Sequence, residues 1–231
     1  MDSTRFDVTT SIQPAALPVA PSAAPAGSPD LRGAGEDPGG RLHRILDHAV
    51  LCADGVYRCP WALVNSVVLE EHDLVWGRRP LTSPAWFEAL AMEIFQAGLA
   101  TGTAAGRRGA LSEAMCGFLP ARTGLLADED VDELMLDRRL IRNRAKLVAV
   151  IHAARLVQGW DTEDWEEITG AAAAHPGEAP RQLAQRFREL GLVHVGPGIA
   201  GHFLARTGVV TGHVEGCHRH PAAGDPTAEG W

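Results

Sequence analysis

Four side chains of the types that bind zinc stand in two pairs near opposite ends of the chain. His213 and Cys217 are four residues apart, which places them on one side of a helical turn, or of a turn that mimics one. Cys59 and His72 can supply the second pair. A Cys₂His₂ shell saturates tetrahedral zinc and leaves no open position for catalysis. Such a site would therefore be structural and would join the two ends of a domain.

Spacing alone leaves other interpretations of these residues open, because pairs so far apart follow no spacing rule. His218 and His220 are competing ligands, although histidines in such a tail are commonly just solvated. The four cysteines, at positions 52, 59, 116 and 217, are too few and too scattered for a disulfide scaffold. The simpler interpretation is that they are buried free thiols.

Glu93 is a carboxylate within an otherwise apolar stretch. On a helical wheel it projects near Trp86, Leu90 and Ala97, which form a largely apolar surface. Burial there would raise its pKa unless hydrogen-bond donors compensate. An isolated buried carboxylate is costly, so burial would favour a functional role. The alternative is an ordinary solvated helix residue.

Between two expected short helices, at residues 131–136 and 143–157, the chain carries the basic run Asp137-Arg138-Arg139-Leu140-Ile141-Arg142. A tight turn that presents backbone N–H groups and arginines can bind phosphate. The same sequence also suits an ordinary solvated loop between helices.

The elements that must position these groups are helical, and the predicted fold class is all-α. Apolar residues recur at helical spacing over residues 42–50, 87–97, 147–157, 183–190 and 199–204. Ser83-Pro84 is typical of a helix start, and Gly98, Gly191 and Gly208 are typical of helix ends. Residues 1–40 and 221–231 are rich in Pro, Ala and Gly, and we expect disordered tails around a helical domain at 41–220.

Composition limits the function classes further. The 231 residues include 45% hydrophobic and 22% charged side chains, enough for a sizeable core. A net charge of −8 argues against binding nucleic acid through a broad, sequence-independent basic surface. It does not exclude a local basic patch. The longest apolar runs are too short to span a membrane, and the N-terminus lacks a secretory pattern. We expect a cytoplasmic monomer without membrane contact.

Six motifs together resemble the DNA-3-methyladenine glycosylase I (Tag) family, a branch of the helix-hairpin-helix DNA glycosylases. The resemblance runs from about residue 56 to residue 220, with the motifs in the family's order and spacing. The motifs are Arg58-Cys59-Pro60-Trp61, His72-Asp73, Trp76-Gly77, Glu93 with Gln96-Ala97-Gly98-Leu99, Ile141-Arg142-Asn143-Arg144-Ala145-Lys146, and Gly208-Val209-Val210 with His213-Val214-Glu215-Gly216-Cys217.

The resemblance implies a helix-hairpin-helix glycosylase fold with a zinc-stapled lobe and an N-glycosidic hydrolase for base-excision DNA repair. The enzyme would flip 3-methyladenine out of double-stranded DNA, and Glu93 would contact the flipped base. The hairpin at Leu140–Lys146 would bind the phosphate backbone of the DNA. The implied zinc ligands are Cys59, His72, His213 and Cys217, and the implied DNA contacts are Arg142, Arg144 and Lys146. Trp61 and Trp76 match aromatic positions near the pocket, or they pack in the core.

The sequence departs from the family where the base pocket is expected. Val68 and Glu71 stand where the family has tyrosines, Thr101 replaces a stacking tryptophan, and Gly201 replaces another tyrosine. Each lost aromatic face weakens the hold on a cationic base by about 0.5–2 kcal/mol. In the hairpin, Arg139 also replaces a glycine.

These departures leave three functions open. In the first, the pocket takes a bulkier N3 or N7 adduct, with Glu71 as a second acidic group facing a cationic lesion. In the second, the chain is a catalytically weakened DNA-binding protein. In the third, the pocket acts on a free small molecule.

Overall fold

The computed structural model describes residues 48–173, 175–192 and 194–223. Within these ranges the chain is mostly helical. No helix in them is long and apolar enough to cross a membrane. The α-helices are α2 (Ser66–Leu74), α3 (Ser83–Gln96), α4 (Arg108–Ala114), α5 (Pro120–Thr123), α6 (Asp128–Leu134), α7 (Arg144–Val157), α8 (Thr162–Ala173), α9 (Ala179–Glu189) and α10 (Pro197–Arg206). The 3₁₀ turns are η1 (Pro60–Val64), η2 (Ala105–Arg107), η3 (Cys116–Phe118) and η4 (Pro221–Ala223).

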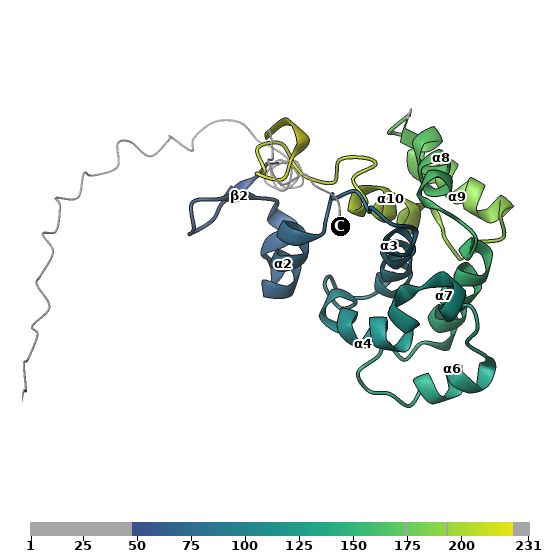
Figure 1. Ribbon diagram of the computed structural model, residues 1–231. Coiled ribbons are helices and arrows are strands. Elements are labelled where there is room, and N and C mark those ends of the chain that lie inside the picture. Colours follow the sequence, from purple (N-terminus) through teal and green to yellow (C-terminus); the bar gives the residue numbers. More distant parts are fainter. Residues whose placement is uncertain (1–47, 174, 193, 224–231) are drawn as a thin grey trace, which may run out of the picture. The chain divides into compact units, whose positions relative to one another are not determined.

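Helix α3 is the centre of the core. It is packed by α7 and α10, with α8 also against it (Figure 1). Nearly every residue from Trp86 to Phe95 is buried, so this helix is enclosed on nearly all sides instead of along one stripe. Trp86 stacks on Trp165 of α8 with the ring planes 4° apart. A side chain of α3 that faces a cavity is therefore held rigidly by the rest of the helix.

The predicted helices at residues 87–97, 131–136, 143–157, 183–190 and 199–204 are confirmed by α3, α6, α7, α9 and α10. The start of α3 differs by one residue, because Thr82 is the N-cap and its hydroxyl accepts from the backbone N–H of Ala85 at 3.3 Å. Apolar spacing did not predict α2, α4, α5 or α8. In α2 the reason is clear, since it buries only Val68 and His72.

The helix predicted over residues 42–50 is wrong in the part that the structure describes. Val50 and Leu51 form strand β1, which pairs antiparallel with β2 (Tyr57–Arg58). An Asp54-Gly55 turn closes this hairpin, with the N–H of Gly55 donating to the carbonyl of Cys52 at 2.9 Å. Residues 42–47, the expected tail at 1–40 and residues 224–231 lie outside the described residues, whereas residues 221–223 form η4.

Two glycines allow a close backbone crossing between the chain after α2 and the end of α10. Gly77 and Gly208 have φ angles of +79° and +66°, which side chains other than glycine rarely adopt. A Cβ at position 208 would collide with the carbonyl of Gly77. The N–H of Gly77 donates to the carbonyl of Arg206 at 2.8 Å, so the crossing is also hydrogen-bonded.

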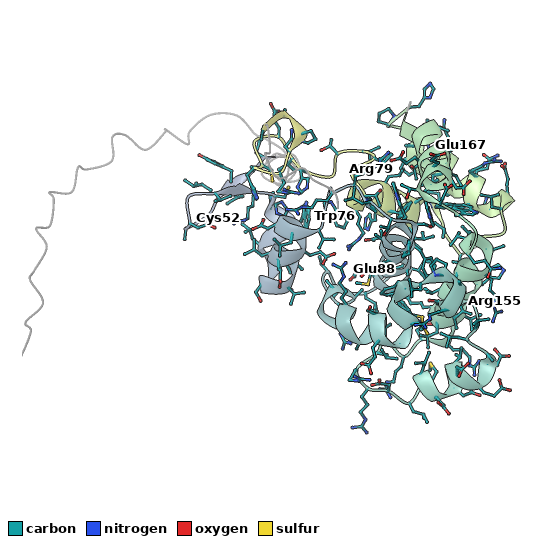
Figure 2. All side chains as sticks on the ribbon, in the orientation of Figure 1. Cys52, Trp76, Arg79, Glu88, Arg155 and Glu167 are labelled. Atoms are coloured by element: carbon teal, nitrogen blue, oxygen red, sulfur yellow. The ribbon has the colours of Figure 1, made fainter. Side chains whose placement is uncertain are left out.

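Elsewhere an arginine joins two helical segments. Arg155 of α7 donates through Nε to the carbonyl of Gly124 at 2.8 Å and through Nη2 to that of Leu126 at 2.7 Å (Figure 2). It satisfies carbonyls between α5 and α6 that would otherwise lack partners. The contact fixes α7 beside the loop that leads into α6.

Candidate active site and metal cluster

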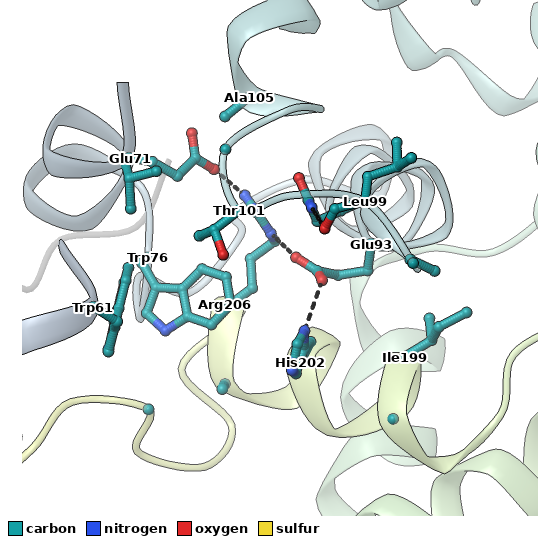
Figure 3. Close-up of a pocket in the computed structure, with 18 residues that line it drawn as sticks. Trp61, Glu71, Trp76, Glu93, Leu99, Thr101, Ala105, Ile199, His202 and Arg206 are labelled. Carbon is teal, nitrogen blue, oxygen red and sulfur yellow. Dashed lines mark hydrogen bonds and ion pairs between the residues drawn. The ribbon is translucent and has the colours of Figure 1, made fainter. Parts of the chain in front are cut away.

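A cavity of about 670 Å³ is lined by residues of η1, α2, α3 and α10 and of the loops that follow α2 and α3 (Figure 3). Glu93 of α3 and Arg206 of α10 both line it. Of the side chains that the sequence placed in a base pocket, those that line this cavity are Trp61, Val68, Glu71, Trp76 and Thr101. The structure therefore brings together residues from distant parts of the chain.

Gly201 is the exception and corrects the sequence interpretation. It is not among the residues that line the cavity, although its neighbours Ile199 and His202 are. A Cβ at position 201 would lie 3.4 Å from Cγ of Pro180 on α9. A side chain at this position would point toward α9, so its small size does not enlarge the cavity.

Glu93 is the most buried carboxylate of the cavity, with only 2% of its surface exposed. Its Oε1 accepts from Nε of Arg206 at 2.6 Å, and its Oε2 lies 3.4 Å from Nδ1 of His202 (Figure 3). Burial alone would raise the pKa of this carboxyl, but the bond to His202 and the charge of Arg206 lower it overall. Glu93 is therefore ionised at neutral pH.

Arg206 and His202 were not predicted from the sequence. Arg206 is buried, and besides Glu93 it also binds Glu71 of α2 through Nη1. Its guanidinium lies 5.0 Å from the centre of the Trp76 ring. Glu71 thus neutralises an arginine instead of adding a free negative charge. The three groups Glu71, Glu93 and Arg206 carry one net negative charge between them.

Trp61 and Trp76 form an aromatic wall between this cavity and the cysteine and histidine residues. Their rings meet edge to face with centroids 5.2 Å apart. The ring of Trp61 also lies 5.0 Å from that of His72. The buried indole nitrogen of Trp76 has no hydrogen-bond partner among the described residues. Trp61 therefore lines the cavity and packs against the ligand cluster at once, whereas the Trp76 ring packs on Trp61 and its carbonyl meets His213.

The four residues predicted as zinc ligands lie together and are all buried. The potential ligand atoms of Cys59, His72, His213 and Cys217 lie within 4.8 Å of one another. Nε2 of His72 is 3.3 Å from Sγ of Cys217 and 3.2 Å from Nδ1 of His213. His213 and Cys217 lie in a turn instead of a helix, with the N–H of Cys217 donating to the carbonyl of Val214 at 3.1 Å. We call these four residues the metal cluster.

The surroundings of the metal cluster fit a bound metal ion. The outer nitrogen of each histidine meets an oxygen, at 2.7 Å from Asp73 Oδ1 for His72 and at 3.2 Å from the Trp76 carbonyl for His213. Such contacts orient the inner nitrogens of metal-ligating histidines. Hydrogen bonds from Cys59 and from both histidines lower the pKa of the Cys217 thiol, which favours the thiolate that metals bind.

The turn between α6 and α7 places its arginines unequally. Leu140 and Ile141 are buried and anchor the turn. Arg139, where the family has glycine, needs no left-handed backbone, because Cys116 and Phe118 are the non-glycine residues with positive φ in the described part of the chain. It is held by Asp137 at 2.8 Å and by Glu113 at 2.9 Å.

The other arginines of the turn are exposed. Arg144 pairs with Asp132 of α6. Arg138 and Arg142 have no hydrogen-bond or ion-pair partner within the described ranges. These two cations are therefore the ones that remain available to an anionic partner.

The position of Lys146 differs from its expected role as a DNA contact. Its Nζ is half-buried and donates to the carbonyl of Phe95 at 2.6 Å and to that of Ala97, both at the end of α3. Burial also lowers its pKa. The side chain closes the C-terminal end of α3, as cations commonly do, instead of extending from the turn. It also fixes the start of α7 next to Gln96, Ala97 and Leu99 on the cavity rim.

Comparisons with known proteins give one consistent result. A family profile described as methyladenine glycosylase matches residues 61–220. The chain is 27% identical over 177 residues to the DNA-3-methyladenine glycosylase of Haemophilus influenzae, covering 69% of this chain and 96% of that protein. It is also 27% identical over 181 residues to DNA-3-methyladenine glycosylase 1 of Escherichia coli, covering 71% and 97%.

Solved structures agree with these sequence matches. A crystal structure of 3-methyladenine DNA glycosylase I (TAG) aligns with a TM-score of 0.63 at 26% identity, covering 71% of this chain and 100% of that one. The structure of a variant of such a glycosylase in complex with 3-methyladenine aligns with a TM-score of 0.60 at 25% identity, covering 71% and 97%.

Proposed function

The chain belongs to the methyladenine glycosylase family, and from this premise we propose that it hydrolyses the N-glycosidic bond of alkylated purines in DNA. The observation that carries the proposal is Glu93, an ionised buried carboxylate that lines an open cavity walled by Trp61 and Trp76. A glycosylase must extrude its target nucleotide from the base stack into such a pocket. The proposed role is base-excision repair of alkylation damage.

The charge of the cavity supports a cationic base. Alkylation at N3 or N7 makes a purine cationic, and the base becomes neutral when it leaves with the electron pair of the glycosidic bond. The net negative charge of Glu71, Glu93 and Arg206 favours binding of such a cation. The aromatic faces of Trp61 and Trp76 add about 0.5–2 kcal/mol for each cation–π contact.

We propose that the substrate is 3-methyladenine or a bulkier N3 or N7 adduct. Val68 and Thr101 both line the cavity, and both are smaller than the aromatic residues that the family resemblance implies there. Thr101 is exposed, which suits the cavity mouth. Smaller side chains leave more room beside the bound base, so larger substituents are tolerated.

The DNA backbone is proposed to bind the turn between α6 and α7. Arg142 and Arg144 are exposed there, and Arg138 joins them as a third candidate. Because Asp132 already partners Arg144, we expect Arg142 to contribute more to phosphate binding. Lys146 would act indirectly, by fixing the start of α7 against α3.

The metal is proposed to be a structural zinc ion held by Cys59, His72, His213 and Cys217. Two thiols and two imidazoles in a tetrahedral arrangement form a complete zinc shell. When bound, the ion would link the β1–β2 segment and α2 to the chain after α10. No catalytic step is assigned to it.

The direct test is release of modified bases from methylated double-stranded DNA, with the products identified by mass. We expect N3- or N7-alkylated purines in the supernatant, above the amount lost from DNA without protein. DNA binding without release would support a weakened DNA-binding protein. Absence of both, with turnover of a free nucleoside, would support a small-molecule enzyme.

The docking surface is tested separately by substituting single arginines. Arg142→Ala should weaken binding to all DNA sequences alike and lower the salt dependence by about one phosphate contact. Arg181→Ala is the matched control, because this exposed arginine lies on α9 and pairs with Glu178. Equal DNA affinity of the Arg142 variant and wild type would contradict the proposed docking.

A further inference from the structure

His202 is the cavity-lining histidine next to Glu93, and no sequence pattern singled it out. It lies on α10, one turn before Arg206, and its side chain is 69% exposed. Its Nδ1 faces Oε2 of Glu93 at 3.4 Å (Figure 3). One nitrogen of the ring is thus directed at a buried carboxylate, while much of the ring meets the solvent of the cavity.

The partner of His202 is itself fixed. The other oxygen of Glu93 accepts a hydrogen bond from Nε of Arg206 at 2.6 Å. Glu93 also belongs to α3, a helix that is almost wholly buried. An ionised carboxylate only accepts hydrogen bonds, so it selects the imidazole tautomer that carries the proton on Nδ1. In the neutral ring, the lone pair is then on Nε2. This is the carboxylate–imidazole arrangement that orients a general base.

The charges around His202 come from three helices. Glu93 on α3 faces it directly, Arg206 lies one turn away on α10, and Glu71 on α2 acts through Arg206. The Trp76 ring, with its centroid 6.4 Å from that of His202, adds an apolar neighbour. Glu93 raises the pKa of His202 above its usual 6.5, which makes the neutral ring a stronger base.

We propose that His202 is the general base of the hydrolysis, with Glu93 as its positioning residue; this inference rests on the proposed glycosylase function. As the bond between C1′ and the base nitrogen breaks, its electron pair leaves with the cationic base, which becomes neutral. A water oxygen forms the new bond to C1′, and Nε2 of His202 takes one proton from that water. The imidazolium then returns the proton to solvent.

The experiment measures single-turnover release of N3- and N7-methylpurines from methylated duplex DNA across a pH range that spans 6.5. Wild type should become faster as the pH rises through the raised pKa of His202, since only the neutral ring accepts a proton. His202→Gln should lose this transition and become about 10²-fold slower, the lower end of general-base effects. His152→Gln on α7 is the matched control and should keep both the rate and the transition.

Rescue separates proton transfer from a merely structural role. Added imidazole should partly restore the rate of His202→Ala, because the side chain is exposed and a small base can enter. It should not accelerate wild type. Binding to undamaged DNA should match wild type in both His202 variants, and both should remain folded at the assay temperature.

The outcomes distinguish the two proposals. A wild-type chain that releases alkylated bases, with a His202→Gln variant of equal rate and equal pH profile, overturns the role of His202 and leaves the glycosylase function standing. A rate that falls as His202 loses its proton would also overturn the general-base role. A wild-type chain that releases no alkylated base overturns both.

Discussion

Two buried polar groups of side chains lie on opposite sides of the Trp61–Trp76 wall, and their chemistry differs. The metal cluster combines four buried ligand residues whose potential ligand atoms lie within 4.8 Å of one another. The cavity group consists of Glu71, Glu93, Arg206 and His202, in which both carboxylates contact Arg206 and Glu93 also faces His202.

The difference indicates what each region needs. A buried thiolate and imidazole set becomes favourable when a cation occupies its centre, so the metal cluster depends on a bound ion. The cavity group already contains its own buried cation, Arg206, and one of its members, His202, is largely exposed. It can exchange a contact with a ligand while the helices around it stay folded. One region is therefore suited to stability and the other to chemistry.

The largest expected effect comes from removing the metal. Strong chelation, or Cys217→Ser, should lower the melting temperature and the zinc content together, because structural zinc contributes on the order of 10 kcal/mol in small domains. Elemental analysis and thermal melting measure the two quantities. Cys52→Ser is the matched control, since Cys52 lies outside the metal cluster. Metal-free protein with an unchanged melting temperature in chelator would show that the metal cluster does not stabilise the fold through a bound ion.

Arg206→Met should have the next largest effect, and it should not depend on chelator. The substitution leaves Glu71 and Glu93 buried without their cation, which typically costs about 3–5 kcal/mol. Denaturant unfolding at neutral pH measures the loss. Combining Arg206→Met with Glu71→Gln and Glu93→Gln should recover much of it, because no unpaired charge is then buried. If the triple variant is no more stable than the single one, charge balance is not what holds this group.

Acid should weaken the cavity group through Glu93. The pKa of Glu93 is lower in the folded chain than its usual 4.5, so its ionised form stabilises the fold fully above pH 4.5. That contribution is lost as the pH falls through the lower, folded pKa. The difference in unfolding free energy between wild type and Glu93→Gln should therefore shrink in acid. A difference that stays constant with pH would show that folding does not lower the pKa of Glu93.

The smallest expected effect is on substrate preference. Thr101→Trp should add an aromatic face to the cavity mouth and favour small cationic bases over bulky ones by about 0.5–2 kcal/mol. Competition between methylated and more heavily alkylated DNA measures the ratio of release rates. Thr103→Trp is the control, because Thr103 does not line the cavity. An unchanged ratio for Thr101→Trp would mean that the smaller lining has no influence on selectivity.

The sequence predicted the metal cluster better than the cavity, for a physical reason. Cysteine and histidine have specific metal-binding chemistry, and the family resemblance selected Cys59 and His72 as the pair that joins His213 and Cys217, far along the chain. Arg206 stands in the last turn of a helix, where an arginine is ordinarily a solvated cation beside the helix dipole. Only the packing of α2, α3 and α10 reveals that it bridges two carboxylates.

Lys146 illustrates the same limit for the turn between α6 and α7. A lysine in the first turn of a basic helix is reasonably interpreted as a phosphate contact. In the structure its flexible side chain reaches the carbonyls that end α3, some 50 residues earlier in the chain. For the fold, apolar stripes predicted the central helices α3 and α7, whereas α8 went unnoticed because its position depends on Trp165 packing on Trp86.

The crossing of Gly77 and Gly208 limits how this sequence can vary. Gly77 follows Trp76, whose carbonyl receives His213 of the metal cluster, and Gly208 lies two residues after Arg206 of the cavity group. Both polar groups therefore depend on the same backbone crossing, which has no space for a Cβ at position 208. In a saturation mutagenesis library, position 208 should tolerate almost no replacement, and the rare variants that still fold should lose zinc and base release together.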